Sequence, residues 1–150
     1  MQVDLHTVLD GELNEVIAHA KTPRLLRFVA DPLIRFSPIE PGTWPDSWAE
    51  GTYLVGVRIF GYLPFGQQAI VISYPESRDG FVMRDNGHSA LIKRWDHTIS
   101  MTAVEGRTRY QDVVIIEAGL LTLPVWLFAK LFYRYRQRRW RLLARRGFRY

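Results

Sequence analysis

The sequence predicts an α+β domain: a curved antiparallel sheet of about six to seven strands, with two short helices near the N-terminus and one long helix at the C-terminus. Three observations support this prediction. Apolar and polar residues alternate repeatedly between residues 2 and 116, two short helical patterns follow the first strand, and residues 122–146 form one long helical pattern. Because no long linker divides the 150 residues, we expect residues 1–150 to form a single domain.

The N-terminal part is predicted to hold a strand, two short helices and a second strand. Apolar residues alternate over residues 3–9, which indicates a strand with one buried face. Asp10 is expected to cap a first helix over residues 13–20, because its side chain can accept free backbone N–H groups. Thr22-Pro23 begins a second helix, and Asp31-Pro32 ends it, since the residue before proline disfavours helical backbone. Leu33 to Ile39 is the expected second strand.

Turn residues divide the middle of the chain into further strands. A proline- and glycine-rich loop carries Trp44 and Trp48, and Gly51 opens a strand that alternates up to Ile59. Residues 61–66 are predicted to turn, and Asn86-Gly87 is predicted to end a strand that begins at residue 81. The last two strands, residues 91–101 and 108–116, are predicted to form a hairpin across Glu105-Gly106.

The C-terminal helix pattern is apolar in its first half and rich in arginine in its second. Thr122 is expected to cap this helix, with Pro124 in the first turn, where a missing N–H costs little. Its inward stripe is predicted to be Phe128, Phe132, Tyr135 and Leu142, interrupted by Arg139. We therefore expect the helix to cover one face of the sheet, with Arg139 as the arginine that could turn inward.

The basic residues of this helix have three interpretations. Nine of the 20 basic residues follow Ala129, and no acidic residue follows Glu117. They could form a solvated helix end that suits the helix dipole and the acidic body, or contact an anionic membrane surface through Arg134, Arg138, Arg141 and Arg145. A third interpretation, nucleic-acid binding, is disfavoured because the aromatic residues mostly have core spacing. A homodimer is left open.

Composition narrows the class of function. The chain has no cysteine, its four histidines show no paired metal-ligand spacing, and no glycine-rich phosphate loop is present, so we expect neither a metal nor a cofactor. The first residues lack the pattern of a signal peptide, and the apolar run at residues 118–129 is too short to span a membrane. We therefore expect a cytoplasmic protein.

The segment Gly106-Arg107-Thr108-Arg109-Tyr110-Gln111-Asp112, followed by a strand and the terminal helix, resembles bacterial members of the START-related superfamily. This superfamily, also called SRPBCC, includes polyketide cyclase and dehydrase-like proteins. The resemblance extends in pattern over nearly the whole chain and implies the helix-grip fold, in which an apolar or amphipathic ligand lies between a curved sheet and a long helix. It implies no catalytic residue, because the superfamily has no universal catalytic motif.

Alternation also predicts a polar pair inside the cavity. The odd-numbered residues of 91–101 and the even-numbered residues of 108–116 are the more apolar, so both sets should face the helix. A loop of two or four residues around Glu105 then places Asp112 opposite His97 or Ile99. His97 and Asp112 could orient a ligand or move a proton, or they could simply satisfy each other in the core.

We therefore expect a ligand-binding module for a small apolar or amphipathic molecule, with two alternatives. These are a cyclase or dehydratase-type enzyme that uses His97 and Asp112, and a peripheral membrane or nucleic-acid adaptor that uses the arginines. The expected ligand-binding residues are Tyr53, Val57, Ile72, Phe81, Met83, Trp95, His97, Tyr110, Asp112, Phe128 and Phe132.

Overall fold

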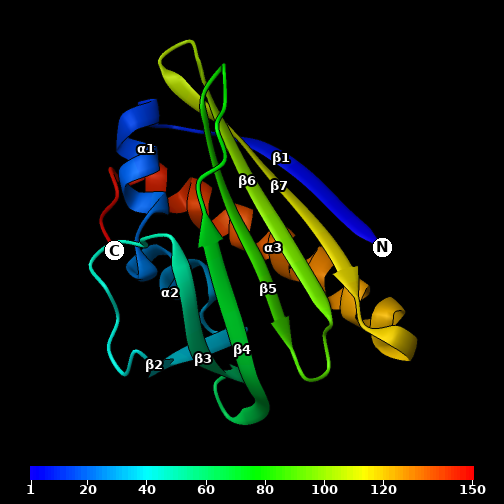
Figure 1. The fold of residues 1–150 in the computed structure, drawn as a ribbon. Coiled ribbons are helices and arrows are strands. Elements are labelled where there is room, and N and C mark those ends of the chain that lie inside the picture. The colour runs from blue at the N-terminus through cyan, green and yellow to red at the C-terminus, as the bar shows by residue number, and fades with distance from the viewer.

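A computed structural model describes all residues 1–150 and confirms the α+β helix-grip arrangement (Figure 1). Seven antiparallel strands form one sheet in the order β1-β7-β6-β5-β4-β3-β2. The strands are β1 (Gln2–Leu9), β2 (Ile34–Glu40), β3 (Gly51–Ile59), β4 (Leu63–Ser73), β5 (Phe81–Ser89), β6 (Arg94–Val104) and β7 (Arg107–Glu117).

The helices all lie on one side of the sheet (Figure 1). They are α1 (Leu13–Ala20), α2 (Pro23–Ala30), the short 3-10 helix η1 (Gly119–Leu121) and the long α3 (Thr122–Arg145). Helix α3 packs against β1 and β7, and α2 packs against α3. The sheet is therefore covered on one face and open to solvent on the other.

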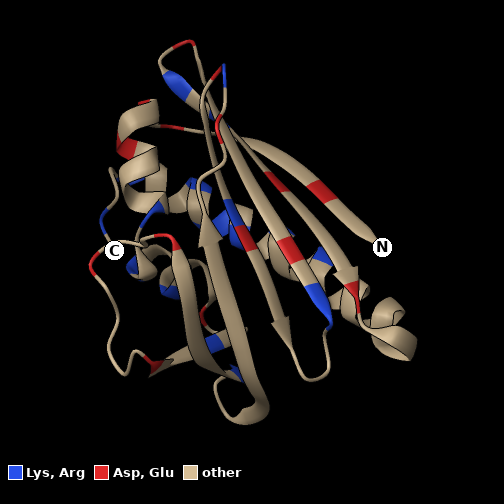
Figure 2. Cartoon of the chain, viewed as in Figure 1, with Lys and Arg blue, Asp and Glu red and all other residues tan.

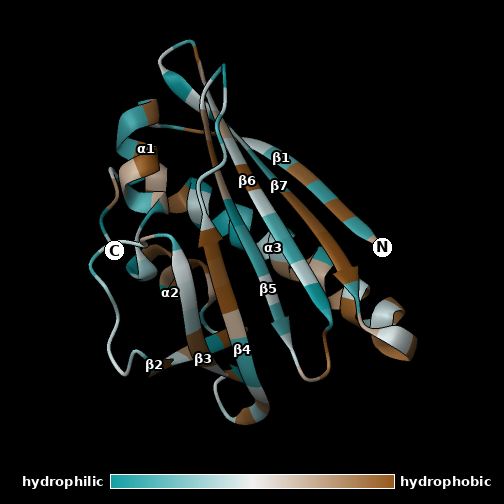
Figure 3. Ribbon diagram, in the orientation of Figure 1, coloured by the Kyte–Doolittle hydropathy of each residue, from teal (hydrophilic) through white to brown (hydrophobic).

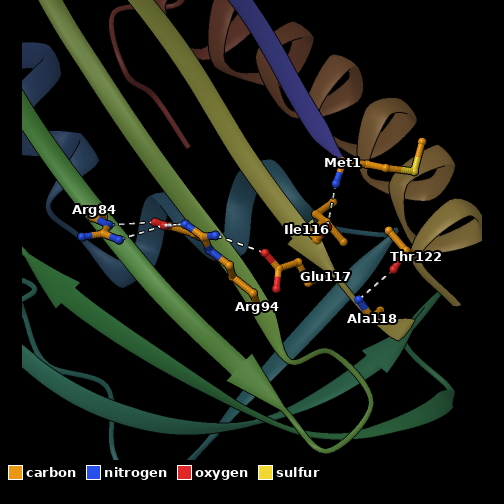
Figure 4. A network of polar contacts seen from close by, with 8 residues as sticks. Met1, Arg84, Arg94, Ile116, Glu117, Ala118 and Thr122 are labelled. Carbon is orange, nitrogen blue, oxygen red and sulfur yellow. Dashed lines mark hydrogen bonds and ion pairs between the residues drawn. The ribbon is translucent and has the colours of Figure 1, made fainter. Parts of the chain in front are cut away.

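A side-chain cap explains where α2 begins. The caps expected at Asp10 for α1 and at Thr122 for α3 are not present, since the N-cap of α3 is Leu121. Thr22 caps α2 by accepting a hydrogen bond from the Leu25 N–H at 3.2 Å. Asp10 does not cap α1, because the N-cap position falls on Glu12, which makes no side-chain cap. Thr122 is the first residue of α3 and its Oγ1 accepts a hydrogen bond from the Ala118 N–H at 2.9 Å, which joins the end of β7 to the helix (Figure 4).

Several predicted strand ends were wrong. β6 runs over Arg94–Val104 instead of residues 91–101, so Leu91 lies in the loop before it. β4 begins at Leu63 and includes Pro64 and Gly66, which were expected in a turn. β5 runs through Asn86-Gly87 as far as Ser89. A Cβ at Gly87 would lie 2.7 Å from the Ala69 carbonyl oxygen, so glycine here permits a close approach between strands instead of a turn.

The β6–β7 hairpin has the predicted two-residue turn. Glu105 and Gly106 both have positive φ, 49° and 74°, as a tight hairpin turn requires. The register places Asp112 opposite Ile99, one of the two partners expected. Asp112 and the odd-numbered residues of β6, including His97, are consequently on the same face of the sheet.

The buried stripe of α3 differs from the prediction by about one residue in phase. Phe132 is buried as expected, but Tyr135 is half-buried and Leu142 is 40% exposed. Arg139 does not interrupt the stripe: its Nη2 donates to the Phe28 carbonyl at 3.0 Å, and its guanidinium lies over the Phe28 ring. The buried residues of α3 are Ala129, Phe132, Tyr133, Arg136, Gln137, Trp140, Leu143 and Ala144.

Charge and hydropathy follow the two layers of the fold. Basic residues recur along α3 and α2, whereas acidic residues lie mostly on strands and loops (Figure 2). Apolar segments alternate with polar ones along β1 and β6, while the second halves of β7 and β4 are more continuously apolar (Figure 3). None of the helices combines the length and apolar character that crossing a bilayer requires.

Candidate ligand cavity and its buried polar network

A cavity of about 360 Å³ lies between the helices and the inner face of the sheet. Twenty of its 25 lining residues are hydrophobic, so most of the wall offers only apolar contacts. The other five are Pro124 and four polar residues, Gln68, Asp85, His97 and Arg136. The apolar part of the wall is formed by residues of α1, α2, β2 to β6, their connections and α3: Ala20, Leu25, Leu26, Ile34, Phe36, Trp48, Val57, Ile59, Phe65, Ile70, Ile72, Met83, Ile92, Trp95, Ile99, Leu121, Val125, Phe128, Phe132 and Tyr133.

The structure brings most of the expected ligand-binding residues onto this wall. Those that line the cavity are Val57, Ile72, Met83, Trp95, His97, Phe128 and Phe132. Phe128 and Phe132 stack with ring centroids 6.0 Å apart on successive turns of α3. Side chains that were predicted from strand alternation and helical spacing therefore face each other across the cavity, from the sheet and from α3.

The remaining four expected residues lie off the wall. The Tyr53 hydroxyl donates to the Ala49 carbonyl, and its ring packs against Trp48. Phe81 packs against Tyr74. Tyr110 and Asp112 are fully buried between the sheet and α3, and they support wall residues from behind.

Asp112 is the centre of a buried hydrogen-bond network. Its Oδ1 accepts from His97 Nε2 at 2.7 Å and from the Tyr110 hydroxyl at 2.8 Å, and its Oδ2 accepts from Gln137 Nε2 at 2.9 Å. Gln137 also donates to the Leu5 carbonyl at 3.0 Å, which ties α3 to β1. The predicted contact between His97 and Asp112 is confirmed, and both carboxylate oxygens are engaged.

The network keeps Asp112 ionised and His97 neutral. Burial alone would raise the pKa of Asp112, but the Arg136 charge and the hydrogen bonds from His97 and Gln137 outweigh it and lower the pKa. Burial lowers the pKa of His97, and the Arg136 charge adds to that shift against the influence of Asp112. Because an ionised carboxylate can only accept, His97 Nε2 carries the proton, and Nδ1 is left as an acceptor.

Chemically, this pair can position a neutral imidazole at the cavity wall. A carboxylate behind an imidazole fixes its tautomer, which is the arrangement of a general base. The same contacts also satisfy both carboxylate oxygens of Asp112, as a purely structural network would. The catalytic role of His97 and Asp112 stays a prediction.

Arg136 is a buried cation on the cavity wall, only 5% exposed. Its Nη2 donates to the Tyr110 hydroxyl at 3.3 Å, its guanidinium lies 5.5 Å from the centroid of the Tyr133 ring, and its Nε has no hydrogen-bond partner. No carboxylate lies within 4.0 Å of the guanidinium to form an ion pair. A charge that is buried but not paired is costly, so this arrangement needs an explanation.

Two further polar groups lie close to Arg136 on the wall. Asp85 of β5 is paired in register with His97, and its Oδ1 accepts from the Val71 N–H at 2.8 Å. Burial raises the pKa of Asp85 to about 7, although the Val71 bond and the Arg136 charge act against the shift. The Tyr133 hydroxyl accepts from Trp95 Nε1 at 3.2 Å, which leaves its own proton available to donate.

Arg136, Asp85 and Gln68 are wall residues that were not expected from the sequence. Arg136 was grouped with the solvated arginines, although it follows Phe132 by four residues and therefore shares its face of the helix. Asp85 has the same parity as Phe81 and Met83 in β5, which was a usable signal. The wall holds no cluster of three or more His, Cys, Asp or Glu side chains arranged to bind a metal ion.

Comparison with known proteins establishes the fold. No family model matches the sequence, and no curated protein matches it. Solved structures are similar over nearly their whole length, among them a protein from Chromobacterium violaceum (14% identity, TM-score 0.68, 96% of this chain and 97% of that chain) and a protein from Thermus thermophilus (10% identity, TM-score 0.68, 98% and 99%). A START superfamily protein from Mycobacterium smegmatis is similar at 9% identity, with a TM-score of 0.61 and 97% of both chains covered. The chain therefore has the START-like helix-grip fold.

Proposed function

We propose that this protein binds a small apolar or amphipathic molecule in the cavity between α3 and the sheet. The observation that carries the proposal is the hollow of about 360 Å³ with its mostly apolar wall. Protein interiors normally pack without voids much larger than a water molecule, so a hollow of this size is suited to a ligand. Burial of apolar surface would supply most of the affinity, at about 25 cal/mol per Å² before the costs of association.

Ligand access is supported by the exposed residues at one end of the cavity. Leu121 at the start of α3 is 45% exposed and Phe65 on β4 is 37% exposed, yet both line the cavity. Leu63 and Tyr62, close to Phe65 in the chain, are also exposed, at 53% and 75%. This apolar rim is where a ligand would pass between water and the interior.

The proposal is tested with the uncharged fluorescent probe N-phenyl-1-naphthylamine and with native mass spectrometry of the purified protein. We expect saturable probe uptake by the wild-type protein and its loss in Val57→Trp, because the larger ring would occupy the cavity. Thr52→Trp is the matched control, since Thr52 is an exposed position of the same strand. A folded wild-type protein that takes up no probe and carries no small molecule would rule the proposal out.

A second candidate function, contact with an anionic membrane surface, is favoured by the outward face of α3 and η1. Four leucines there are strongly exposed: Leu120 (101%), Leu123 (55%), Leu127 (49%) and Leu131 (66%). Arg134 and Arg138 continue the same helix face and are exposed. The other two arginines expected to contact a membrane are engaged, since Arg141 donates to Thr7 and Arg145 lies 3.5 Å from Asp10.

An exposed leucine row followed by arginines suits the interface of an anionic bilayer. We expect the protein to co-sediment with phosphatidylglycerol vesicles at low salt and much less with phosphatidylcholine vesicles. The double variant Leu127→Gln/Leu131→Gln should reduce this binding, whereas Leu91→Gln, at an exposed leucine on the β5–β6 loop, should not. Absence of binding to the anionic vesicles at low salt would exclude this candidate.

A further inference from the structure

The unpaired Arg136 guanidinium is a feature that apolar binding alone does not explain. A guanidinium stays protonated and carries five N–H donors. In this structure it makes one side-chain hydrogen bond, a 3.3 Å contact with the neutral Tyr110 hydroxyl, while its buried Nε has no partner. Donors are therefore left over on a cation that lines a cavity.

The buried carboxylate of Asp112 does not fill this role. Asp112 is held by His97, Tyr110 and Gln137, which use both of its oxygens. Tyr110 stands between the two charges, since its hydroxyl donates to Asp112 and accepts from Arg136. Asp112 thus offsets the charge of Arg136 at a distance but does not bond to it.

The surroundings of Arg136 suit an incoming acid. Tyr133 lies beside the guanidinium and its hydroxyl retains a proton to donate. Asp85, the other carboxyl on the wall, has a pKa raised to about 7 by burial, so near neutral pH much of it is uncharged and repels an anion little. Beyond these groups the wall is apolar, as the chain of an amphipathic molecule requires.

We infer that the ligand is an apolar carboxylic acid whose carboxylate pairs with the Arg136 guanidinium while its hydrocarbon part fills the apolar hollow. The inference rests on the binding function proposed above and names its ligand class. Arginine and carboxylate match in planar, two-point geometry, and such charge-assisted hydrogen bonds are among the stronger polar contacts. The pairing would also supply the partner that the buried cation lacks.

The test compares decanoic acid with decanol as competitors of N-phenyl-1-naphthylamine at pH 6.5, where Asp85 is mostly uncharged. A hollow without a specific cation site should prefer decanol, because removing a carboxylate from water is costly. We expect decanoate to displace the probe at a concentration about tenfold or more below that of decanol, since a hydrogen-bonded charge contributes at least this much. Arg136→Gln should abolish or reverse the preference, and the exposed Arg138→Gln is the matched control that should retain it.

The outcomes separate this inference from the function on which it rests. If the wild-type protein binds the probe but decanol competes as well as decanoate, the cavity binds ligands and the acid inference is wrong. An unchanged preference in a folded Arg136→Gln also overturns it. If neither probe nor competitor binds, the binding function itself fails. Should Arg136→Gln not fold, the wild-type comparison of decanoate with decanol decides alone.

Discussion

Arginine side chains are paired with carboxylates on the outer face of the strands β5, β6 and β7 but not on the inner face. On the outer face, Arg84 donates two hydrogen bonds of 2.8 Å to Asp96, and Arg94 bridges Asp96 and Glu117 at 3.1 Å (Figure 4). On the inner face, Arg136 reaches into the cavity with no carboxylate in contact. Arg84 and Arg94, which are close to water, both pair with carboxylates. Arg136, which is buried, pairs with none. The difference indicates that the inner cation serves something other than stability.

The carboxyl groups repeat this contrast. The hydrogen bond from Arg84, helped by Arg94, lowers the pKa of Asp96 on the outer face, although Asp96 itself is buried. Inside, Asp112 has a lowered pKa because its network outweighs burial, whereas burial dominates at Asp85 and raises its pKa to about 7. Three carboxyl groups on adjacent strands therefore differ in charge state near neutral pH because their partners differ.

The largest effect is expected when the inner network loses its carboxylate. Asp112→Ala leaves His97, Tyr110 and Gln137 without their shared acceptor and removes the charge that offsets Arg136. Breaking a buried ionic network typically lowers the free energy of unfolding by about 3–5 kcal/mol. Urea denaturation measures this loss in the free energy of unfolding.

The outer face supplies the comparison for that variant. Asp96→Ala should cost only about 1 kcal/mol, because Arg84 and Arg94 are each 40% exposed and can turn to water. Equal losses in the two variants would contradict the distinction between the faces.

The second effect is a pH dependence of the free energy of unfolding, caused by Asp85. Its pKa is raised in the folded protein, so between about pH 4 and pH 7 the folded state binds more protons than the unfolded state. The free energy of unfolding should therefore fall as pH rises through this window, by at most about 1.4 kcal/mol per pH unit from this group. Asp85→Asn should flatten the profile measured by urea denaturation at several pH values. A profile unchanged by that substitution would mean that Asp85 is ionised in the folded state.

Asp112 should act in the opposite direction at lower pH. Its folded pKa lies below the ordinary value, so its contribution is present above about pH 4 and is lost as pH falls through the folded pKa. The two carboxyl groups thus affect different pH ranges, which allows one titration series to separate them.

A smaller effect is expected from the hydroxyl beside Arg136. Tyr133→Phe removes the acceptor of Trp95 Nε1 and leaves the ring contacts with His97 and Phe132 in place. Loss of one such hydrogen bond should lower the free energy of unfolding by about 1 kcal/mol. Trp95 fluorescence should also shift, since its N–H loses a partner. A loss as large as that of Asp112→Ala would place Tyr133 in the network instead of beside it.

The smallest effect is expected on the outer face. Arg84→Ala leaves Asp96 paired with Arg94, and the lost contact is close to water. The change in the free energy of unfolding should be below about 1 kcal/mol and should shrink further in high salt. A larger, salt-insensitive loss would show that the outer pairs are as important as the inner network.

Prediction from sequence succeeded where local geometry determines the result. Alternation in β6 and β7, together with a two-residue turn that fixes the register, was enough to bring His97 and Asp112 together. The covering helix followed from helical periodicity, whereas the place of β1 beside β7, at the edge opposite β2, was not predicted.

Prediction failed where the decisive contact is distant in sequence. The phase of α3 was misjudged because Arg136 was treated as a solvent-facing residue, although it shares the helix face of Phe132 and contacts Tyr110 and Tyr133. The end of β5 was misplaced because Gly87 is required by the Ala69 carbonyl of β4, a contact that no local pattern contains. Asp85 was overlooked as a wall residue although it has the parity of Phe81 and Met83.

A crystal structure of the protein with decanoate bound would test the central claim most directly. We predict the hydrocarbon chain under Phe128 and Phe132 and the carboxylate within hydrogen-bond distance of the Arg136 guanidinium. A ligand found only on the surface, or a chain inside with its carboxylate at the rim near Phe65 and Leu121, would contradict the account.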